Sequence, residues 1–312
     1  MNLQQFEYII AVDRFRSFTK AAEYCNVTQA TLSAMIKKLE EELDLVLFDR
    51  KNIPVVTTEC GREIVDEARK VILHSEKIRQ LPAQIKNHIV GQVRIGIIPT
   101  VASSLLPLII KPIVTAYPEL VIEWLEITTD QIVQQLKDGL LDAGILATPL
   151  QQQTDIEENI LFYEKLMVYG QTEGRKQYLL PEELKQHKVW ILEEGHCLRS
   201  QFMNLCKLEK KDLDAPFIFE PSSFETLINL VESFGGLTLL PELYCQQLSA
   251  EKQEKVLDFQ APYPVREVSM VYYRPYAKFR IIEALTEQIA GLIQPQLASS
   301  MIKNSDLVIV QI

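Results

Sequence analysis

The spacing of apolar residues changes at Val90, and this change constrains the fold of the 312-residue chain more than any other feature. Before Val90 the apolar residues recur at helical spacing. After it, short apolar runs alternate with amphipathic helical stretches, a pattern typical of a mostly parallel α/β sheet. The sequence therefore predicts a helical first part and an α/β second part, with ligands expected at the carboxyl ends of the strands.

The helical part begins with the outline of a helix-turn-helix. Apolar stripes predict helices over residues 2–13, near 18–24 and over about 28–42, and only a short connection joins the last two. Thr28 is a suitable N-cap for the third helix.

The third predicted helix has an outward face that suits DNA. Short polar side chains near a helix N-terminus can reach base edges, and lysines can hold phosphates. Two short strands around Arg50-Lys51-Asn52 form a predicted wing, whose cations could reach the flanking backbone. A small helical bundle with a solvated polar face explains the pattern equally well. The outward residues are Gln29, Thr31, Ser33, Lys37 and Lys38.

Charge alone does not indicate DNA binding. The net charge is −10, and residues 1–60 hold seven Lys and Arg against nine Asp and Glu, so any nucleic-acid contact must come from a local surface. Because we find no signal-peptide pattern and no run of about eighteen apolar residues, we expect a cytoplasmic protein. The five cysteines are an odd, sparse set, so we expect reduced thiols.

A long amphipathic helix begins near Thr58 and continues for about twenty-five residues. The preceding module is too small to bury it, which favours a dimer seam. We expect the following domains: residues 1–58, a DNA-binding module; 59–89, a linker helix; 90–298, an α/β domain with lobe I (about 90–163 and 268–298) and lobe II (about 164–267); and 299–312, an apolar tail with no evident partner.

Lobe I contains the strands VRIGIIPT, VIEWLEITT and AGILATPL, separated by two amphipathic helices. Thr100 ends the first strand and Thr129 the second, so both hydroxyls could face one crevice. Capping of the following helices is the alternative role. Lobe II is predicted from the strands EKLMVYGQ, KVWILEEG and FIFEPSS and the helix FETLINLVESF. The chain is then predicted to return to lobe I through the strand VREVSMVYYRP and the helix FRIIEALTEQIAGLIQPQ.

Residues 193–206, EEGHCLRSQFMNLC, place Cys197 and Cys206 nine positions apart. In a continuous helix this separation is about 13.5 Å along the axis, with the thiols on opposite faces. A disulfide needs Cα atoms within about 4.4 to 6.8 Å. Either the cysteines never pair, or pairing forces the segment to refold.

The segment AAEYCNVTQATLSAMIKKLEEELDLVLFDR resembles the winged helix-turn-helix of LysR-type transcriptional regulators. The segments IGIIPT, EITTDQIVQQLKDGLLD, LEEGHCLRSQFMNLC and SFETLINLVESFGGLTLLP resemble the OxyR-like, peroxide-sensing branch, and the likeness runs from Met1 to about Gln294. Three positions depart from the family pattern. Asp44 replaces a Gly in the turn after the recognition helix, Ala30 replaces a frequent Pro, and Cys60 replaces a frequent Ala.

The resemblance implies a fold with a winged helix-turn-helix, a linker helix and a two-lobed α/β domain like that of periplasmic binding proteins. It implies promoter DNA and RNA polymerase as partners, hydrogen peroxide as the signal, and a homotetramer built from linker-helix dimers. We expect no cofactor and no metal. The residues carried over to DNA binding are Thr28, Gln29, Ala30, Thr31, Ser33, Lys37, Lys38, Arg50 and Lys51.

The resemblance also implies a redox switch, Cys197 with Cys206. Peroxide is attacked by thiolate, so we expect helix-terminal amides, His196 and Arg199 to depress the pKa of Cys197. Hydroxyls such as those of Thr100 and Thr129 would hold the peroxide, the product would be a sulfenic acid, and Cys206 would resolve it. The segment from about 198 to 206 must then unwind.

Other functions remain open on the sequence alone. A regulator that binds a small metabolite near Thr100 and Thr129 is one, and a thiol peroxidase or oxidoreductase is another, although C-x-x-C is absent. A zinc site at Cys197, Cys206 and His196 lacks a nearby fourth ligand. Cys25 and Cys245 are expected to be small buried fillers. Arg266 could anchor the hinge or the switch segment, or form a surface ion pair.

Overall fold

The structure, a computed structural model, describes residues 1–52, 54–85, 89–150, 155–171, 178–208, 221–273 and 278–311. The chain divides into two compact units, Met1–His88 with Pro275–Lys278 and Ile89–Arg274 with Phe279–Ile312.

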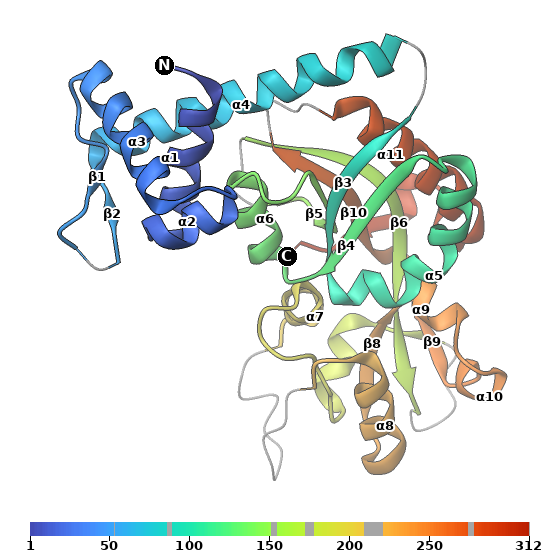
Figure 1. The fold of residues 1–312 in the computed structure, drawn as a ribbon. Coiled ribbons are helices and arrows are strands. Elements are labelled where there is room, and N and C mark those ends of the chain that lie inside the picture. Colours follow the sequence, from blue (N-terminus) through green and yellow to red (C-terminus); the bar gives the residue numbers. More distant parts are fainter. Residues whose placement is uncertain are drawn as a thin grey trace. The chain divides into compact units, whose positions relative to one another are not determined.

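The first unit contains the three helices, the wing and the linker helix that the sequence predicts (Figure 1). Its core combines one face of each of the first three helices with the start of the linker helix. The wing strands are antiparallel. The elements are α1 (Leu3–Phe15), α2 (Phe18–Tyr24), α3 (Gln29–Leu43), β1 (Phe48–Asp49), β2 (Val56–Thr57) and α4 (Glu59–Ile85).

The ends of α3 follow from its sequence. The Thr28 side chain accepts a hydrogen bond from the Thr31 amide at 3.1 Å, so the predicted N-cap is confirmed. The helix ends at Asp44, whose φ of 54° and ψ of 39° are left-handed. A glycine usually occupies such a position, and Asp is among the residues that tolerate it, so this departure from the family pattern leaves the turn intact.

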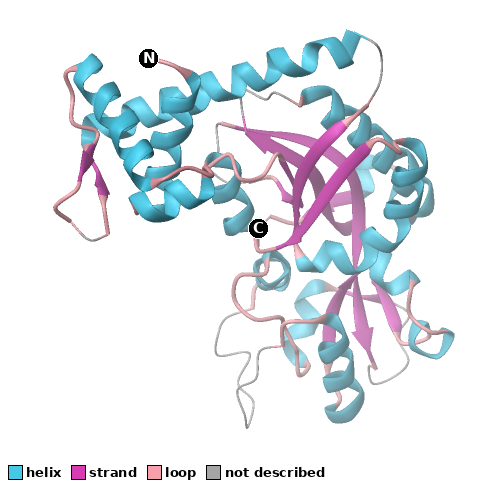
Figure 2. Ribbon diagram, viewed as in Figure 1, coloured by secondary structure: helices cyan, strands magenta, loops and turns pink. Residues whose placement is uncertain are grey.

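The second unit is built on a nine-stranded sheet with the order β4-β3-β5-β10-β6-β9-β7, in which β11 pairs with β10 and β8 pairs with β6. Helices cover the sheet (Figure 2). The strands are β3 (Gly91–Ile97), β4 (Leu120–Glu126), β5 (Ala143–Thr148), β6 (Ile156–Gly170), β7 (Tyr178–Leu179), β8 (Leu237–Pro241), β9 (Val256–Phe259), β10 (Tyr263–Tyr273) and β11 (Leu307–Ile309).

The α-helices of this unit are α5 (Pro99–Ala116), α6 (Thr129–Lys137), α7 (Cys197–Cys206), α8 (Phe224–Phe234), α9 (Glu242–Gln246), α10 (Ala250–Gln253) and α11 (Phe279–Ile293). Its 3₁₀ helices are η1 (Pro181–Gln186), η3 (Gln294–Gln296), η4 (Ala298–Met301) and η5 (Asn304–Asp306). By length and composition α5 alone among the described helices could span a membrane. It instead connects the parallel strands β3 and β4 and buries Val101, Leu105 and Ile109, as the crossover helix of an α/β fold does.

The long strand β6 belongs to both lobes. It pairs with β10 from Ile156 to Lys165, and with β8 from Leu166 to Gly170. The sheets of lobe I and lobe II are therefore continuous through one strand.

Two predictions for lobe II need correction or fall outside the structure. The predicted strand KVWILEEG forms only an isolated bridge between Val189 and Leu237. Its apolar residues are buried, so the apolar run predicted burial correctly and a β-ladder wrongly. The predicted strand FIFEPSS lies mostly in residues 209–220, outside the described residues. The tail, which had no predicted partner, contributes β11 to the sheet.

Candidate functional site

The cysteine stretch folds into α7, which begins at Cys197 and ends at Cys206. Both thiols are free and buried. A helix of this length separates their Cα atoms by about 13.5 Å along its axis, well beyond the reach of a disulfide. His196 is the N-cap, and Lys207 ends the helix in a left-handed conformation with φ 50°.

One face of α7 is part of the lobe II core. Leu198, Phe202 and Cys206 are each at most 3% exposed and belong to the same hydrophobic cluster. Met203 and Leu205 are partly buried and pack against it. Their four-residue spacing places the first three side chains on one stripe, so unwinding the helix would remove them from the core.

The Cys197 thiol lies against a buried polar pocket. Burial raises the pKa of the thiol, while the positive charge of Arg266, the Thr129 hydroxyl, the Leu198 amide and the Thr100 hydroxyl each act to lower it. The net effect is a raised pKa. The expectation of a depressed pKa is therefore wrong for this form of the protein, because the desolvation cost of a thiolate exceeds the stabilisation by its neighbours.

Thr100 and Thr129 do not cap their helices. The N-cap residues are Ile98 for α5 and Thr128 for α6, so each threonine lies within the first turn. The Thr100 hydroxyl accepts a hydrogen bond from Arg266 Nη1 at 3.1 Å. The Thr129 hydroxyl is buried and has no partner at hydrogen-bonding geometry. A buried donor without a partner is costly, and one beside a thiol is available to a small polar ligand.

Arg266 supplies the charge in this pocket from within β10. It is fully buried, with its Nε 2.7 Å from Glu164 Oε1 and its Nη2 2.8 Å from the carbonyl oxygen of Thr100. The alternative of a surface ion pair is therefore wrong. Sequence reasoning missed Glu164, which pairs with Arg266 across adjacent strands. The available signal was an acidic residue inside the mainly apolar second half of β6.

His196 and Arg199 occupy different positions from those expected. His196 is 9% exposed, and its Nε2 lies 3.7 Å from Glu193 Oε1. Arg199 donates from Nη1 to the carbonyl oxygen of Leu192 at 2.7 Å, which ties the first turn of α7 to the preceding segment. The cation that lowers the pKa of Cys197 is Arg266, from a distant part of the chain.

The other buried thiols also have raised pKa values. Burial and the negative charge of Glu182 raise the pKa of Cys206 to about 12. Burial also raises the pKa of Cys245, which is 5% exposed and part of the lobe II core, so its predicted burial is confirmed. Cys25 is half-buried and packs against the core of the first unit. Among the described residues no group of three His, Cys, Asp or Glu side chains could hold a metal ion.

A cavity of about 220 Å³ lies between the lobes. Thr100 and Glu126 line it from lobe I, and Leu192, Glu225 and Tyr244 line it from lobe II. The metabolite alternative would use this cavity.

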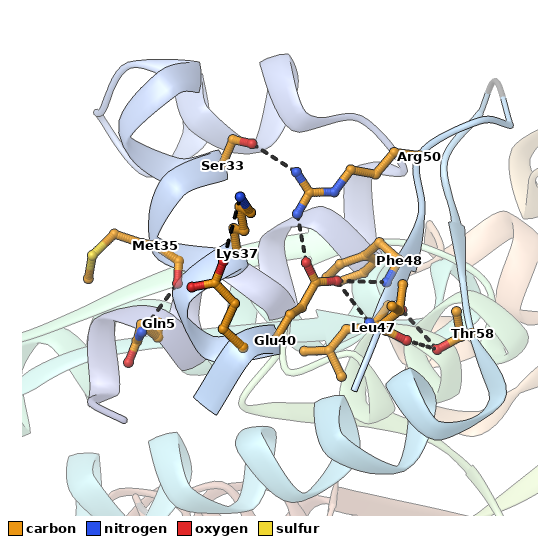
Figure 3. A network of polar contacts seen from close by, with 11 residues as sticks. Gln5, Ser33, Met35, Lys37, Glu40, Leu47, Phe48, Arg50 and Thr58 are labelled. Atoms are coloured by element: carbon orange, nitrogen blue, oxygen red, sulfur yellow. Dashed lines mark hydrogen bonds and ion pairs between the residues drawn. The ribbon is translucent and has the colours of Figure 1, made fainter. Parts of the chain in front are cut away.

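The outward face of α3 is exposed as predicted, at Thr28, Gln29, Ala30, Thr31, Lys37 and Lys38, whereas Ser33 is half-buried. Arg50 is exposed but tied to this helix, as Figure 3 shows: Nη1 donates to Ser33 Oγ at 3.0 Å and Nη2 to Glu40 Oε2 at 2.8 Å. The other oxygen of Glu40 accepts from the Leu47 amide at 2.9 Å. Glu40 thus joins the wing to the helix, and sequence reasoning missed it.

Lys51 is exposed at the wing, and its amide donates to Asp49 Oδ1 at 2.9 Å. The Asp49 side chain therefore closes the turn from which the Lys51 side chain extends.

Comparisons with known proteins agree with this geometry. Residues 3–62 match the model for the bacterial regulatory helix-turn-helix protein, lysR family, and residues 86–292 match the LysR substrate binding domain. The chain is 35% identical over 300 residues to the DNA-binding transcriptional dual regulator OxyR of Escherichia coli, covering 95% of this chain and 96% of that protein. It is 31% identical over 300 residues to the hydrogen peroxide-inducible genes activator of Haemophilus influenzae, covering 94% and 99%.

Among solved structures, a full-length OxyR variant from Pseudomonas aeruginosa superposes with a TM-score of 0.75 at 31% identity, covering 93% of this chain and 98% of that one. Two family models together account for both units of the chain. The chain therefore belongs to the LysR family of bacterial transcriptional regulators, as a DNA-binding protein similar to OxyR rather than an enzyme.

Proposed function

We propose that this regulator senses hydrogen peroxide by oxidation of Cys197, followed by a disulfide with Cys206. The observation that carries the proposal is the position of Cys197 at the start of α7, against Arg266 and two threonine hydroxyls, with a second free thiol at the other end of the same helix. The names of the peroxide-inducible relatives support it.

In the first step the Cys197 sulfur attacks one oxygen of the peroxide and the O–O bond breaks. The departing hydroxide takes up the thiol proton and leaves as water, and the other hydroxyl stays on the sulfur as a sulfenic acid. The unpartnered Thr129 hydroxyl can donate to the departing oxygen, and Arg266 stabilises negative charge on the sulfur. Burial raises the pKa of the resting thiol, so its proton must be transferred before or during the attack.

In the second step the Cys206 sulfur attacks the sulfenic sulfur, and a second water leaves as the disulfide forms. With its pKa near 12, Cys206 is unreactive inside the core. Unwinding of α7 both brings the two sulfurs together and exposes Cys206 to water, which restores an ordinary thiol pKa of about 8.5. The helix thus delays the second step until it opens.

Refolding of α7 changes the surface of the α/β domain and so the association of protomers and the spacing of their DNA-binding modules. The exposed apolar residues Val71 and Ile78 on α4 support a dimer through this helix. A homotetramer on promoter DNA, acting on RNA polymerase at oxidative-stress genes in the cytoplasm, completes the proposal.

The test is oxidation of the full chain with one equivalent of peroxide, followed by thiol counting and peptide mapping. We expect the loss of two thiols per chain and a bond between Cys197 and Cys206. A Cys197→Ser variant should bind promoter DNA without responding to peroxide, whereas the control Cys60→Ala should respond normally. A normal peroxide response in Cys197→Ser would show the proposal to be wrong.

The inter-lobe cavity supports a second candidate, a regulator that binds a small metabolite there. Its volume of about 220 Å³ is below the range of about 300 to 1,000 Å³ that is usual for ligand pockets. The carboxylates of Glu126 and Glu225 would favour a cationic ligand. A Glu225→Gln variant should change the response if a metabolite acts here and should leave it unchanged if peroxide acts at Cys197.

A further inference from the structure

The 307–311 segment lies beside the proposed switch helix, and its strand β11 extends the sheet at a defined place. β11 pairs in parallel with β10, with Leu307 opposite Tyr263 and Ile309 opposite Val265. The Val310 amide then donates to the carbonyl oxygen of Val265 at 2.9 Å. One edge of β10 pairs with β6. Along its other edge β10 pairs with β5 only from Glu267 onward, and β11 pairs with the residues before it that β5 leaves unpaired.

The same segment contacts α7 through polar side chains. Gln201, fully buried, donates from Nε2 to the carbonyl oxygen of Val310 at 3.1 Å, and Asn204 donates from Nδ2 to that of Gln311 at 3.4 Å. Residues 201 and 204 share one face of the helix. In Figure 1 the end of the chain accordingly lies next to α7.

An apolar contact joins the two elements as well. The Val310 side chain is 5% exposed and belongs to the lobe II core together with Leu198, Phe202 and Cys206. Two residues earlier, Val308 is 46% exposed. The segment therefore inserts one valine beneath α7 and leaves the other in solvent.

The buried amide of Gln201 indicates that the contact is specific. The amide oxygen of Gln201 is buried without a hydrogen-bond partner, so no hydrogen bond offsets the free-energy cost of removing it from water. The amide nitrogen of Gln201 does make a hydrogen bond, to the Val310 carbonyl oxygen, and this bond offsets the cost of burying the nitrogen. An apolar residue would fill the site at lower cost, but it would not bind the Val310 backbone.

These contacts exist only while α7 is helical. Gln201 and Asn204 lie between the two cysteines, and closing a disulfide must shorten a Cα separation of about 13.5 Å to less than about 7 Å. Unwinding moves both amides away from the segment and takes Leu198 and Phe202 out of the core around Val310. A partner that binds only one of two conformations shifts the equilibrium towards that conformation.

We propose that the 307–311 segment holds α7 in its helical, reduced form and so sets the redox poise of the Cys197–Cys206 pair. This proposal rests on the proposed peroxide-sensing function. Formation of the disulfide releases the segment from Gln201 and Asn204, and reduction allows it to dock again. The segment acts by positioning α7, because it contacts neither the peroxide that reacts with Cys197 nor the sulfenic acid that reacts with Cys206.

The test measures the reduction potential of the pair in full-length protein equilibrated with glutathione. In this exchange two protein thiols and one glutathione disulfide give the protein disulfide and two glutathione thiols. We compare Val310→Ala with Val308→Ala, which makes the same change at an exposed position two residues away. We expect the equilibrium constant for disulfide formation to rise about tenfold in Val310→Ala, which is about 30 mV for a two-electron couple, and to stay within about twofold of wild type in the control.

A purely structural role of Val310 would stabilise the reduced and oxidised forms alike and leave the potential unchanged. Equal potentials in wild type and both variants would overturn the proposal. If Val310→Ala does not fold, Val310→Thr keeps the shape of the side chain but places a hydroxyl in the core beneath α7, and it should raise the same constant.

Hydrogen exchange of residues 307–311 gives a second readout. We expect protection of these amides in the reduced wild type and its loss in the disulfide form; equal protection in both forms contradicts the proposal. Peptide mapping distinguishes a failure of the proposed peroxide sensing from a failure of the proposed role of the 307–311 segment. If peroxide forms no Cys197–Cys206 bond, the proposed sensing chemistry fails and this role fails with it. If the bond forms and the potentials coincide, only the role of the 307–311 segment is wrong.

Discussion

Arg266 Nε and Glu164 Oε1 lie 2.7 Å apart on neighbouring strands, and neither side chain is exposed to solvent. Glu164 therefore offsets part of the charge that Arg266 directs at Cys197. Removing one member of a buried pair leaves the other uncompensated, which costs about 3 to 5 kcal/mol. The pair thus couples the stability of the domain to the chemistry of the thiol.

Replacing Arg266 should slow oxidation of Cys197. In Arg266→Gln the thiol loses the only cation that lowers its pKa among the described groups, and we expect the reaction with peroxide to slow by about 10- to 100-fold. Arg266→Lys keeps the charge and should retain more of the rate, although lysine cannot reproduce the contacts to both Glu164 and Thr100. Stopped-flow measurement of thiol loss, with urea unfolding as a check on stability, distinguishes them. Identical rates in all three proteins would exclude this role.

The Thr129 hydroxyl should accelerate the first step without stabilising the fold. Thr129→Val keeps the size of the side chain and removes a donor, so we expect a peroxide rate about 10- to 100-fold lower at little cost in stability. Thr128→Val is the matched control, because Thr128 caps α6 with Gln131. This control should lower stability by about 1 kcal/mol and leave the rate unchanged. The reverse pattern would place the hydroxyl of Thr129 in a structural role.

Alkaline pH should destabilise the reduced domain. Cys206 has a pKa of about 12 in the fold and, like other free thiols, about 8.5 when unfolded, so the folded state keeps a proton that the unfolded state loses between these values. The contribution of such a thiol to stability is therefore constant below about pH 8.5 and falls above it, by about 1.4 kcal/mol per pH unit. Urea unfolding at several pH values should give a shallower slope for Cys206→Ala than for wild type. Parallel curves would contradict the raised pKa.

Glu40 should matter for DNA binding although it cannot contact DNA favourably. Glu40→Gln weakens its bond to Arg50 and its hold on the wing, so we expect affinity to fall several-fold for specific and non-specific DNA alike. Glu41→Gln removes the same charge one residue away, where only an exposed pair with Lys37 is lost. That control should bind as tightly as wild type or slightly tighter. Fluorescence anisotropy at two salt concentrations measures both, and equal affinities would show that the wing needs no anchor.

The sequence predicted the elements that depend on local periodicity. The helices α1 to α3 and the cap at Thr28 follow from side-chain spacing and capping chemistry, which act within a few residues. It also placed Cys197 at the start of a helix after a Gly. These features need no knowledge of distant contacts.

Sequence reasoning missed the contacts that act across the fold, including those of Arg266, which it named only as a possible anchor of the hinge or the switch segment. Arg266 meets Glu164 because β10 runs beside β6 in a register that no local pattern encodes. Its charge acts on Cys197 from about seventy residues along the chain. For the same reason sequence reasoning favoured the neighbours His196 and Arg199 as activators of the thiol and not Arg266, the cation that lowers its pKa. The partner of the tail is hidden in the same way, since β11 lies about forty residues along the chain from the strand it joins. The raised pKa of Cys197 also depends on burial by distant residues.

The continuity of β6 through both lobes limits how the α/β domain can move. At Lys165 the strand still pairs with β10, and at Leu166 it pairs with β8, so the two ladders meet without a flexible connection. The Arg266–Glu164 pair lies one residue from that junction. A clamshell closure of the lobes would have to bend a hydrogen-bonded ladder beside a desolvated ion pair, whereas repacking α7 leaves this ladder unchanged. We therefore expect the conformational change that follows oxidation to occur at the outer surface of α7, while the two lobes keep their relative orientation.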